Sequence, residues 1–298
     1  MLKKIKQKFT SLKASVLFAI LWTVCFVCIL SYGIYKLNTK TESKYIKICA
    51  VQNNENPWEN GINVYSENVR NLMKLTTEAL ELNPDVKIVV WPETAVVPSI
   101  MKNYYERNDI QRTALVDKLL LFIEEMDTKL LTGNFHSVKN GQTYDDYNSA
   151  LYFVPGKNVY PPKPEVYSKI KLVPFSETIP FPKVFQSLVM ENNFANIHIW
   201  KEGDDFKVFH DGDFAFSAPI CFEDNFGFLC RKFVLNGARA FINLSNDSWA
   251  ESLAAQYHHL YMAMFQPSSI WTIGACVVFD QFGYGYGFTA YTVYMMRF

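Results

Sequence analysis

The sequence lacks an excess of charge of either sign. Its 298 residues include 29 Lys and Arg and 29 Asp and Glu, so the formal net charge is zero. Without a basic field there is no long-range attraction to nucleic acid, and no nucleic-acid partner is expected. Only 19% of the residues are charged whereas 49% are apolar. This composition excludes a disordered chain and suffices for a sizeable core.

Cysteine is also scarce, and its six residues are scattered along the chain. Their spacing fits neither a disulfide framework nor a zinc site. Cys25 and Cys28 form a Cys-x-x-Cys pair inside a long apolar run, where neither a thiolate nor a metal is easily stabilised. We interpret this pair as lipid-facing or packing residues. The other four are Cys49, Cys221, Cys230 and Cys276.

One long hydrophobic run lies near the N-terminus. Nineteen residues without a charge extend from Val16 to Ile34. At about 1.5 Å per residue, this run can cross a hydrocarbon core about 30 Å thick. A cleaved signal peptide is the alternative, but it has a shorter apolar stretch and a small-residue cleavage site, which Ser31–Ile34 does not resemble. We therefore predict a transmembrane helix at 16–36 after a basic cytoplasmic N-terminus at 1–15, an orientation that the flanking lysines favour slightly.

Residues 44–298 are expected to form one domain, because no linker rich in Pro, Gly or Ser and no internal repeat divides them. Hydrophobic patterns predict buried strands that alternate with helices. The strands are expected at 46–51, 86–91, 130–133, 149–154, 215–220 and 240–244, and the helices at 66–82, 114–126, 226–236 and 253–265. Continuous apolar strands separated by helices indicate an α/β fold whose sheet is covered on both faces.

Three segments carry reactive side chains near predicted strand ends, where open α/β sheets place their sites. Glu93 follows one strand and Cys221 ends another, while Lys169 lies in an apolar loop. Taken singly, Glu93 is interpreted as a helix cap or surface carboxylate, the loop as a solvated turn and Cys221 as a buried structural thiol. Together they supply a thiol nucleophile, a base for its proton and a cation for an oxyanion.

Four motifs in a fixed order extend this pattern. They are Trp-Pro-Glu-Thr at 91–94, Tyr-x-Lys-x-x-Leu-Val-Pro-Phe-x-Glu at 167–177, Ile-Cys-Phe-Glu at 220–223 and Leu-Ser-Asn-Asp-x-Trp at 244–249. In this order the motifs resemble the nitrilase (carbon-nitrogen hydrolase) superfamily, and within it the catalytic domain of the bacterial apolipoprotein N-acyltransferase family. The resemblance extends from about Lys47 to Met264.

The resemblance implies a role for each matching residue. Glu93 becomes the general base, Cys221 the nucleophile and Lys169 the cation that stabilises the oxyanion. Lys171 does not match the family lysine, because that lysine lies eight positions before the glutamate that Glu177 matches.

Further residues match supporting positions of the family. Glu177 is implied to be a second acid that steadies the base and the lysine. The backbone amide of Phe222 is implied to complete the oxyanion hole, and Glu223 to assist the site. Asn246, Asp247 and Trp249 match a loop that lines the site. An Asx-type cap on the following helix is the alternative interpretation of that loop.

The resemblance also implies a fold and a reaction. The fold is a four-layer α-β-β-α sandwich, here preceded by one transmembrane helix. The reaction is acyl transfer through a cysteine thioester, without a cofactor or metal. A membrane phospholipid is the acyl donor, and the N-terminal amine of a lipid-modified apolipoprotein is the acceptor. The implied location is the bacterial inner membrane, with the catalytic domain on its extracytoplasmic side.

Two departures from the family keep alternatives open. The family has a bundle of membrane helices before the domain, whereas this chain has one. After Met264 the family pattern is lost, so we expect the C-terminal end to be atypical or truncated from about residue 265, and a frameshift near Phe279–Gly283 is one hypothesis for it. The alternatives are a membrane-tethered amidase with water as the acceptor, and a catalytically inactive fragment of the acyltransferase.

Overall fold

The computed structural model describes residues 2–38, 44–54, 56, 58–179, 198–250, 252, 254–259, 261–262, 275–279 and 290–297. Within these ranges it describes only the backbone of 2–12, 36–37, 249–250, 275–279 and 290–297. The chain divides into two compact units, Met1–Ser43 and Lys44–Phe298.

The first unit contains the predicted N-terminal helix. Helix α1 spans Leu2–Asn38, and its apolar segment Lys13–Tyr35 is long enough to cross a membrane by length and composition. The side chains of 13–35 are exposed within the unit. The predicted helix is confirmed, and its insertion in a membrane stays a prediction.

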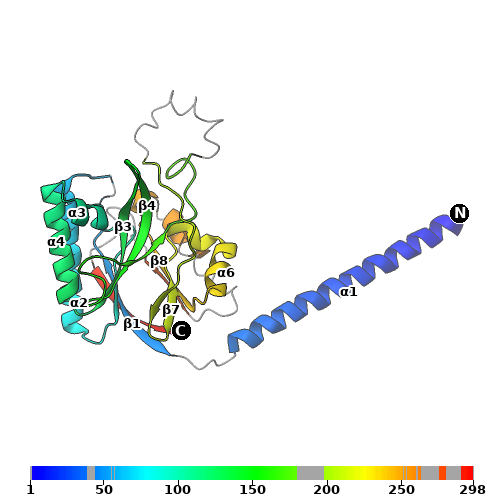
Figure 1. The fold of residues 1–298 in the computed structure, drawn as a ribbon. Helices are drawn as coiled ribbons and strands as arrows, with labels where there is room; N and C mark the ends of the chain where they lie inside the picture. Colours follow the sequence, from blue (N-terminus) through cyan, green and yellow to red (C-terminus); the bar gives the residue numbers. More distant parts are fainter. Residues whose placement is uncertain are drawn as a thin grey trace. The chain divides into compact units, whose positions relative to one another are not determined.

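The second unit contains two sheets (Figure 1). The strands are β1 (Tyr45–Gln52), β2 (Ile88–Val90), β3 (Lys129–Asn140), β4 (Thr143–Phe153), β5 (Glu165–Ser168), β6 (Phe209–Asp211), β7 (Phe214–Ser217), β8 (Ala240–Leu244), β9 (Ala275–Phe279) and β10 (Ala290–Arg297). One sheet has the order β10-β1-β2-β3-β4-β5 and the other β6-β7-β8-β9. Strands β1, β2 and β3 are parallel, as are β7, β8 and β9, so each sheet has a parallel centre.

Alternation along the strands produces the layers. Ile48 and Ala50 of β1 belong to a buried cluster shared with the second sheet, whereas Cys49 and Val51 belong to a cluster shared with the helices. Those helices are α2 (Ile62–Leu82), α3 (Ile100–Glu106) and α4 (Ile110–Glu125), and α6 (Gly227–Leu235) packs on the second sheet. The predicted α-β-β-α sandwich is confirmed, with α2 and α4 on one outer side and α6 on the other (Figure 1).

Helices α2 and α4 cover the sheet because their apolar residues recur with helical period. In α2 the buried residues are Val69, Leu72, Thr76 and Ala79, a spacing of three and four that forms one face. Helix α4 begins at the Asp109 cap, whose side chain accepts a hydrogen bond from the Arg112 amide at 3.0 Å.

Several elements differ from the sequence prediction. Strands β3 and β4 are longer than predicted because they form a hairpin, paired from Leu130 with Phe153 to Asn140 with Thr143, whose outer half is polar. Strand β7 ends early because Pro219 has no N–H to donate to the ladder. The short elements α3, β5 and β6 were not predicted, and β5 occupies the start of the expected lysine loop.

The C-terminal region adds a strand to each sheet. Strand β9 pairs with β8 in parallel, and β10 pairs antiparallel with β1 along its whole length. Neither strand was predicted, because the family pattern is lost after Met264 and backbone pairing does not depend on that pattern. Residues 254–259 and 261–262 are helical within the predicted helix 253–265, and the rest of that range lies outside the described residues.

A close backbone contact fixes the turn that carries Glu93. Strand β3 passes so near that turn that a Cβ on Gly133 would lie 2.3 Å from the Thr94 nitrogen and 2.4 Å from the Pro92 oxygen. The Gly133 amide instead donates a hydrogen bond to the Pro92 carbonyl at 3.1 Å. Position 133 therefore has to be glycine, because the nearby atoms belong to the backbone and cannot rotate away.

We expect Gly133→Ala to lower the free energy of unfolding by about 1–3 kcal/mol, because the methyl group must displace the Glu93 turn. Gly141→Asn is the control: Gly141 has φ of +61° with no atom near an added Cβ, and asparagine tolerates this left-handed conformation. Chemical denaturation of the full chain in detergent measures both. Equal stability of the two variants would contradict the close contact.

Candidate active site

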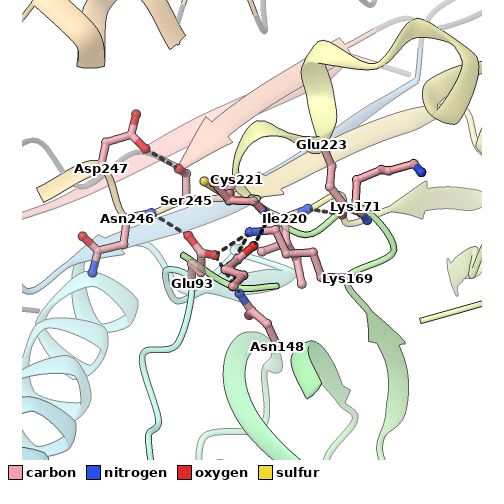
Figure 2. Close-up of polar contacts among 12 residues, drawn as sticks. Glu93, Asn148, Lys169, Lys171, Ile220, Cys221, Glu223, Ser245, Asn246 and Asp247 are labelled. Atoms are coloured by element: carbon pink, nitrogen blue, oxygen red, sulfur yellow. Dashed lines mark hydrogen bonds and ion pairs between the residues drawn. The ribbon is translucent and has the colours of Figure 1, made fainter. Parts of the chain in front are cut away.

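The ammonium group of Lys169 lies between two carboxylates, those of Glu93 and Glu177. Figure 2 shows Lys169 with Glu93 and Asn148. Lys169 Nζ is 2.8 Å from Glu177 Oε1 and 3.3 Å from Glu93 Oε1. Lys169 directly follows β5 and is 1% exposed, and Glu93 lies just beyond β2. The structure thus brings together the predicted base, the predicted cation and the predicted second acid, which are far apart in sequence.

Asn148 joins the same two carboxylates and was missed by the sequence analysis. Its Nδ2 donates to Glu93 Oε1 at 2.8 Å and to Glu177 Oε1 at 3.4 Å. Asn148 lies on β4, on the face that also carries the core residues Ala150 and Tyr152. A polar residue continuing an apolar face was the available signal.

Cys221 occupies a strained turn between a strand and a helix. It has φ of +53° and begins the 3₁₀ helix Cys221–Asn225. A positive φ is uncommon for a residue other than glycine and often marks a functional site. Before it, Ile220 forms a parallel bridge with Leu244 at the end of β8. The backbone therefore presents the Cys221 side chain at the carboxyl edge of the second sheet, above Glu93 in Figure 2.

Glu223 ties the lysine segment to the cysteine segment. Its Oε1 accepts hydrogen bonds from the Ile170 and Lys171 amides at 2.8 and 2.9 Å. Its Oε2 accepts from the Tyr167 hydroxyl and the Ile220 amide, both at 2.8 Å. One buried carboxylate thus holds the chain on both sides of Lys169 and the residue before Cys221.

The loop after β8 contacts the base through its backbone. The Asn246 amide donates to Glu93 Oε2 at 3.2 Å. The Asn246 side chain accepts from the Ser248 amide at 3.2 Å and from the Ser248 hydroxyl, so it caps the 3₁₀ helix Asp247–Ala250 rather than the helix that follows. The cap is of the predicted Asx type, but it lies on a different helix. The lining of the site by this loop stays a prediction.

The remaining predicted residues lie near this group. Asp247 is buried and accepts a hydrogen bond from the Ser245 hydroxyl at 3.1 Å. The Phe222 ring centroid is 5.6 Å from Lys169 Nζ. The side chain of Trp249 lies outside the described residues. Lys171 directs its Nζ toward the Phe228 ring, 5.8 Å away, and not toward the carboxylates.

Burial sets the protonation of the site. Burial raises the pKa of Glu93, and Glu177 adds to this while Lys169 opposes it. Burial acts to lower the pKa of Lys169, but the charges of Glu93, Cys221 and Glu177 outweigh it, so the net shift is upward. Burial also raises the pKa of Cys221 well above the ordinary thiol value. The group therefore contains a permanent cation and a thiol that needs a base to become a nucleophile.

Within the ranges described, no cluster of three or more His, Cys, Asp or Glu side chains could hold a metal ion. The cation of the group is the Lys169 ammonium, whose charge acts on Cys221. An ammonium group can stabilise an oxyanion.

Comparison with known proteins assigns a family to most of this unit. The model of the carbon-nitrogen hydrolase family matches residues 47–267. Apolipoprotein N-acyltransferase 1 of Treponema pallidum is 42% identical over 225 residues, covering 74% of this chain and 41% of that protein. Apolipoprotein N-acyltransferase 1 of Treponema denticola is 36% identical over 258 residues, covering 83% of this chain and 47% of that protein. The chain spans about half the length of these curated relatives.

Solved structures show the same fold at low sequence identity. Nit3 of Saccharomyces cerevisiae, a member of branch 10 of the nitrilase superfamily, has a TM-score of 0.55 at 15% identity and covers 87% of this chain and 92% of its own. A carbon-nitrogen hydrolase of Helicobacter pylori G27 has a TM-score of 0.52 at 15% identity, and the match covers 80% of this chain and 73% of that protein.

We expect Lys169→Met to lower the free energy of unfolding by about 3–5 kcal/mol, because it leaves two buried carboxylates without their cation. Lys171→Met is the matched control and should cost no more than about 1 kcal/mol, the scale of an exposed cation–π contact. Denaturant unfolding of the full chain in detergent measures both losses. Similar losses would show that Lys169 is not the structural cation of the site.

Proposed function

The chain belongs to the carbon-nitrogen hydrolase family, and from this premise we propose that it is a membrane-bound N-acyltransferase. The acyl donor is a phospholipid, and the acceptor is the N-terminal amine of a lipid-modified apolipoprotein. The observation that carries the proposal is the buried Lys169, paired with Glu93 and Glu177 beside Cys221. Relatives named apolipoprotein N-acyltransferase at 36% and 42% identity support the choice of reaction within the family.

The first half-reaction forms a thioester. Glu93 takes the proton of the Cys221 thiol as the sulfur attacks the ester carbonyl of the phospholipid. The oxyanion is held by the Lys169 ammonium and the Phe222 amide. The carbon–oxygen bond then breaks, and the lysophospholipid oxygen leaves with the proton from Glu93. The acyl chain stays on Cys221 as a thioester.

The second half-reaction forms an amide. The neutral N-terminal amine of the apolipoprotein attacks the thioester carbonyl and gives a proton to Glu93, while Lys169 and the Phe222 amide again hold the oxyanion. The carbon–sulfur bond breaks, and the Cys221 sulfur regains the proton from Glu93. Glu177 and Asn148 hold Glu93 and Lys169 in place, Glu223 joins the two chain segments, and the loop of Asn246, Asp247 and Trp249 lines the site.

The N-terminal helix supports a location of the enzyme in the membrane, where both proposed substrates are held by their lipid chains. We assign residues 1–15 to a cytoplasmic segment, 16–36 to a transmembrane helix and 44–298 to the catalytic domain. The domain then lies on the extracytoplasmic side of the bacterial inner membrane. Holding enzyme and lipids in one bilayer raises their effective concentration and limits their orientations.

Two alternatives use the same residues differently. A membrane-tethered amidase would pass the acyl group from Cys221 to water. A catalytically inactive fragment would keep the fold and lack turnover. The family name supports an amidase, and the apolar helix fits both enzymes. The relatives named apolipoprotein N-acyltransferase favour acyl transfer.

We expect the full chain, in vesicles containing phospholipid with a labelled acyl chain and no amine acceptor, to accumulate labelled protein. The label should be released by hydroxylamine, because hydroxylamine cleaves a thioester, and Cys221→Ala should abolish labelling. Cys28→Ala is the control thiol variant and should label normally. Gel electrophoresis with detection of the label measures all three.

Other outcomes identify the alternatives. Amide turnover without lipid and without accumulated label would favour the amidase. A folded chain that never becomes labelled and turns over no amide would favour the inactive fragment. Label that persists in Cys221→Ala would contradict the nucleophile.

The orientation has its own test. A reporter fused after Thr39 should lie outside the cytoplasm, because residues 1–15 are placed inside. A phosphatase that works only in the periplasm should therefore be active at this position, and a fluorescent protein that works only in the cytoplasm should be dark. A cytoplasmic signal would overturn both the orientation and the lipoprotein acceptor.

A further inference from the structure

One histidine lies between two buried carboxylates beside the candidate active site. His259 Nδ1 is 2.6 Å from Asp247 Oδ2, and His259 Nε2 is 3.4 Å from Asp224 Oδ1. The three side chains are 10%, 5% and 3% exposed, in that order. The Asp247 contact is a hydrogen bond, whereas the Asp224 contact is an ion pair without hydrogen-bond geometry. A carboxylate on each side of the ring favours its doubly protonated, positively charged form.

The charges of this group depend on one another. Burial acts to lower the pKa of His259, but Asp224 and Asp247 outweigh it and raise that pKa to about 11. Burial raises the pKa of Asp224, and His259 opposes the shift. His259 is therefore the cation that lies between the two carboxylates. Without it, two like charges would face each other in a buried environment.

Asp224 belongs to the turn that carries the nucleophile. It lies in the 3₁₀ helix that begins at Cys221. The Asn243 side-chain amide, at the end of β8, donates to Asp224 Oδ2 and also to the Cys221 carbonyl at 2.8 Å. The position of the Asp224 carboxylate is thus linked through Asn243 to the backbone of Cys221.

Asp247 belongs to the loop that holds the base. It follows Asn246, whose amide donates to Glu93 Oε2. The helical segment 254–259 contacts Asp247 twice: Gln256 Nε2 donates to its carbonyl at 3.1 Å, and His259 binds its carboxylate. Residues three apart share one face of a helix, so this face fixes the loop.

We propose that His259 is a positioning residue, which as an imidazolium holds the Cys221 turn and the Glu93-binding loop in register by binding Asp224 and Asp247 together. It does not touch the substrate. That His259 contributes to acyl transfer rests on the proposed thioester chemistry. That His259 sets the position and reactivity of the Cys221 thiol does not depend on that chemistry.

The test measures alkylation of Cys221 by iodoacetamide in the full chain in detergent, followed by mass spectrometry of the Cys221 peptide. We expect His259→Gln to slow alkylation by about tenfold to a hundredfold, because the thiol loses its alignment with Glu93. His258→Gln is the matched control, because His258 is the exposed neighbour, and its rate should stay within about twofold of the unchanged chain. Equal rates for the two variants would overturn the proposal.

A double variant separates charge from packing. Asp224→Asn combined with His259→Gln removes one negative and one positive charge, and its two amide side chains can hydrogen-bond to each other. We expect it to recover most of the alkylation rate lost in His259→Gln. A loss that persists unchanged would assign the effect to packing and overturn the ionic role.

A second measurement needs no His259 variant to fold. In the unchanged chain labelled with ¹⁵N-histidine, the NMR signal of His259 should show both ring nitrogens protonated at about pH 8, where an ordinary histidine is neutral. The signal is assigned because it persists in His258→Gln and changes in Asp247→Asn. A neutral His259 at this pH would overturn the proposal. Neither measurement uses phospholipid or lipoprotein, so failure of the proposed acyl transfer would leave these results interpretable.

Discussion

The site depends on a buried ammonium group. Lys169 is almost fully removed from water, and such a charge is stable only beside carboxylates that replace its hydration. Glu93 and Glu177 supply them, and Asn148 donates to both. These residues come from the ends of β2 and β5, from β4 and from the following loop. The neutralisation of one charge therefore requires several separate segments to converge.

Backbone constraints then set the distances around this charge. Gly133 lets β3 approach the Glu93 turn closely, and the left-handed conformation of Cys221 turns the chain from β7 into a helix. Glu223 connects the two halves of the site by accepting from amides on both sides. These contacts are made before any substrate binds, which is the condition for electrostatic stabilisation of a developing oxyanion.

A second ionic group is connected to the turn of the nucleophile. It has the same arrangement as the Lys169 group, because His259 lies between the carboxylates of Asp224 and Asp247. The Lys169 group contains the base Glu93 itself. The His259 group is connected to Cys221 through Asn243 and to Glu93 through Asn246. Burial raises the pKa of Cys221, and the charges of Glu93 and Asp247 add to this while Lys169 opposes it.

The sequence by itself determined the central strands of both sheets, the helices α1, α2, α4 and α6, the family and the order of the four motifs. The apolar strands and amphipathic helices were legible because each obeys a local period, and the family resemblance is confirmed by the match over residues 47–267. The contact partners were not legible. Asn148 has no motif around it, His259 meets Asp224 across 35 positions, and β10 pairs with β1 from the far end of the chain. Hydrogen bonds and ion pairs between distant segments exist only once the sheets are stacked, so tertiary structure alone decided which polar residues share a site.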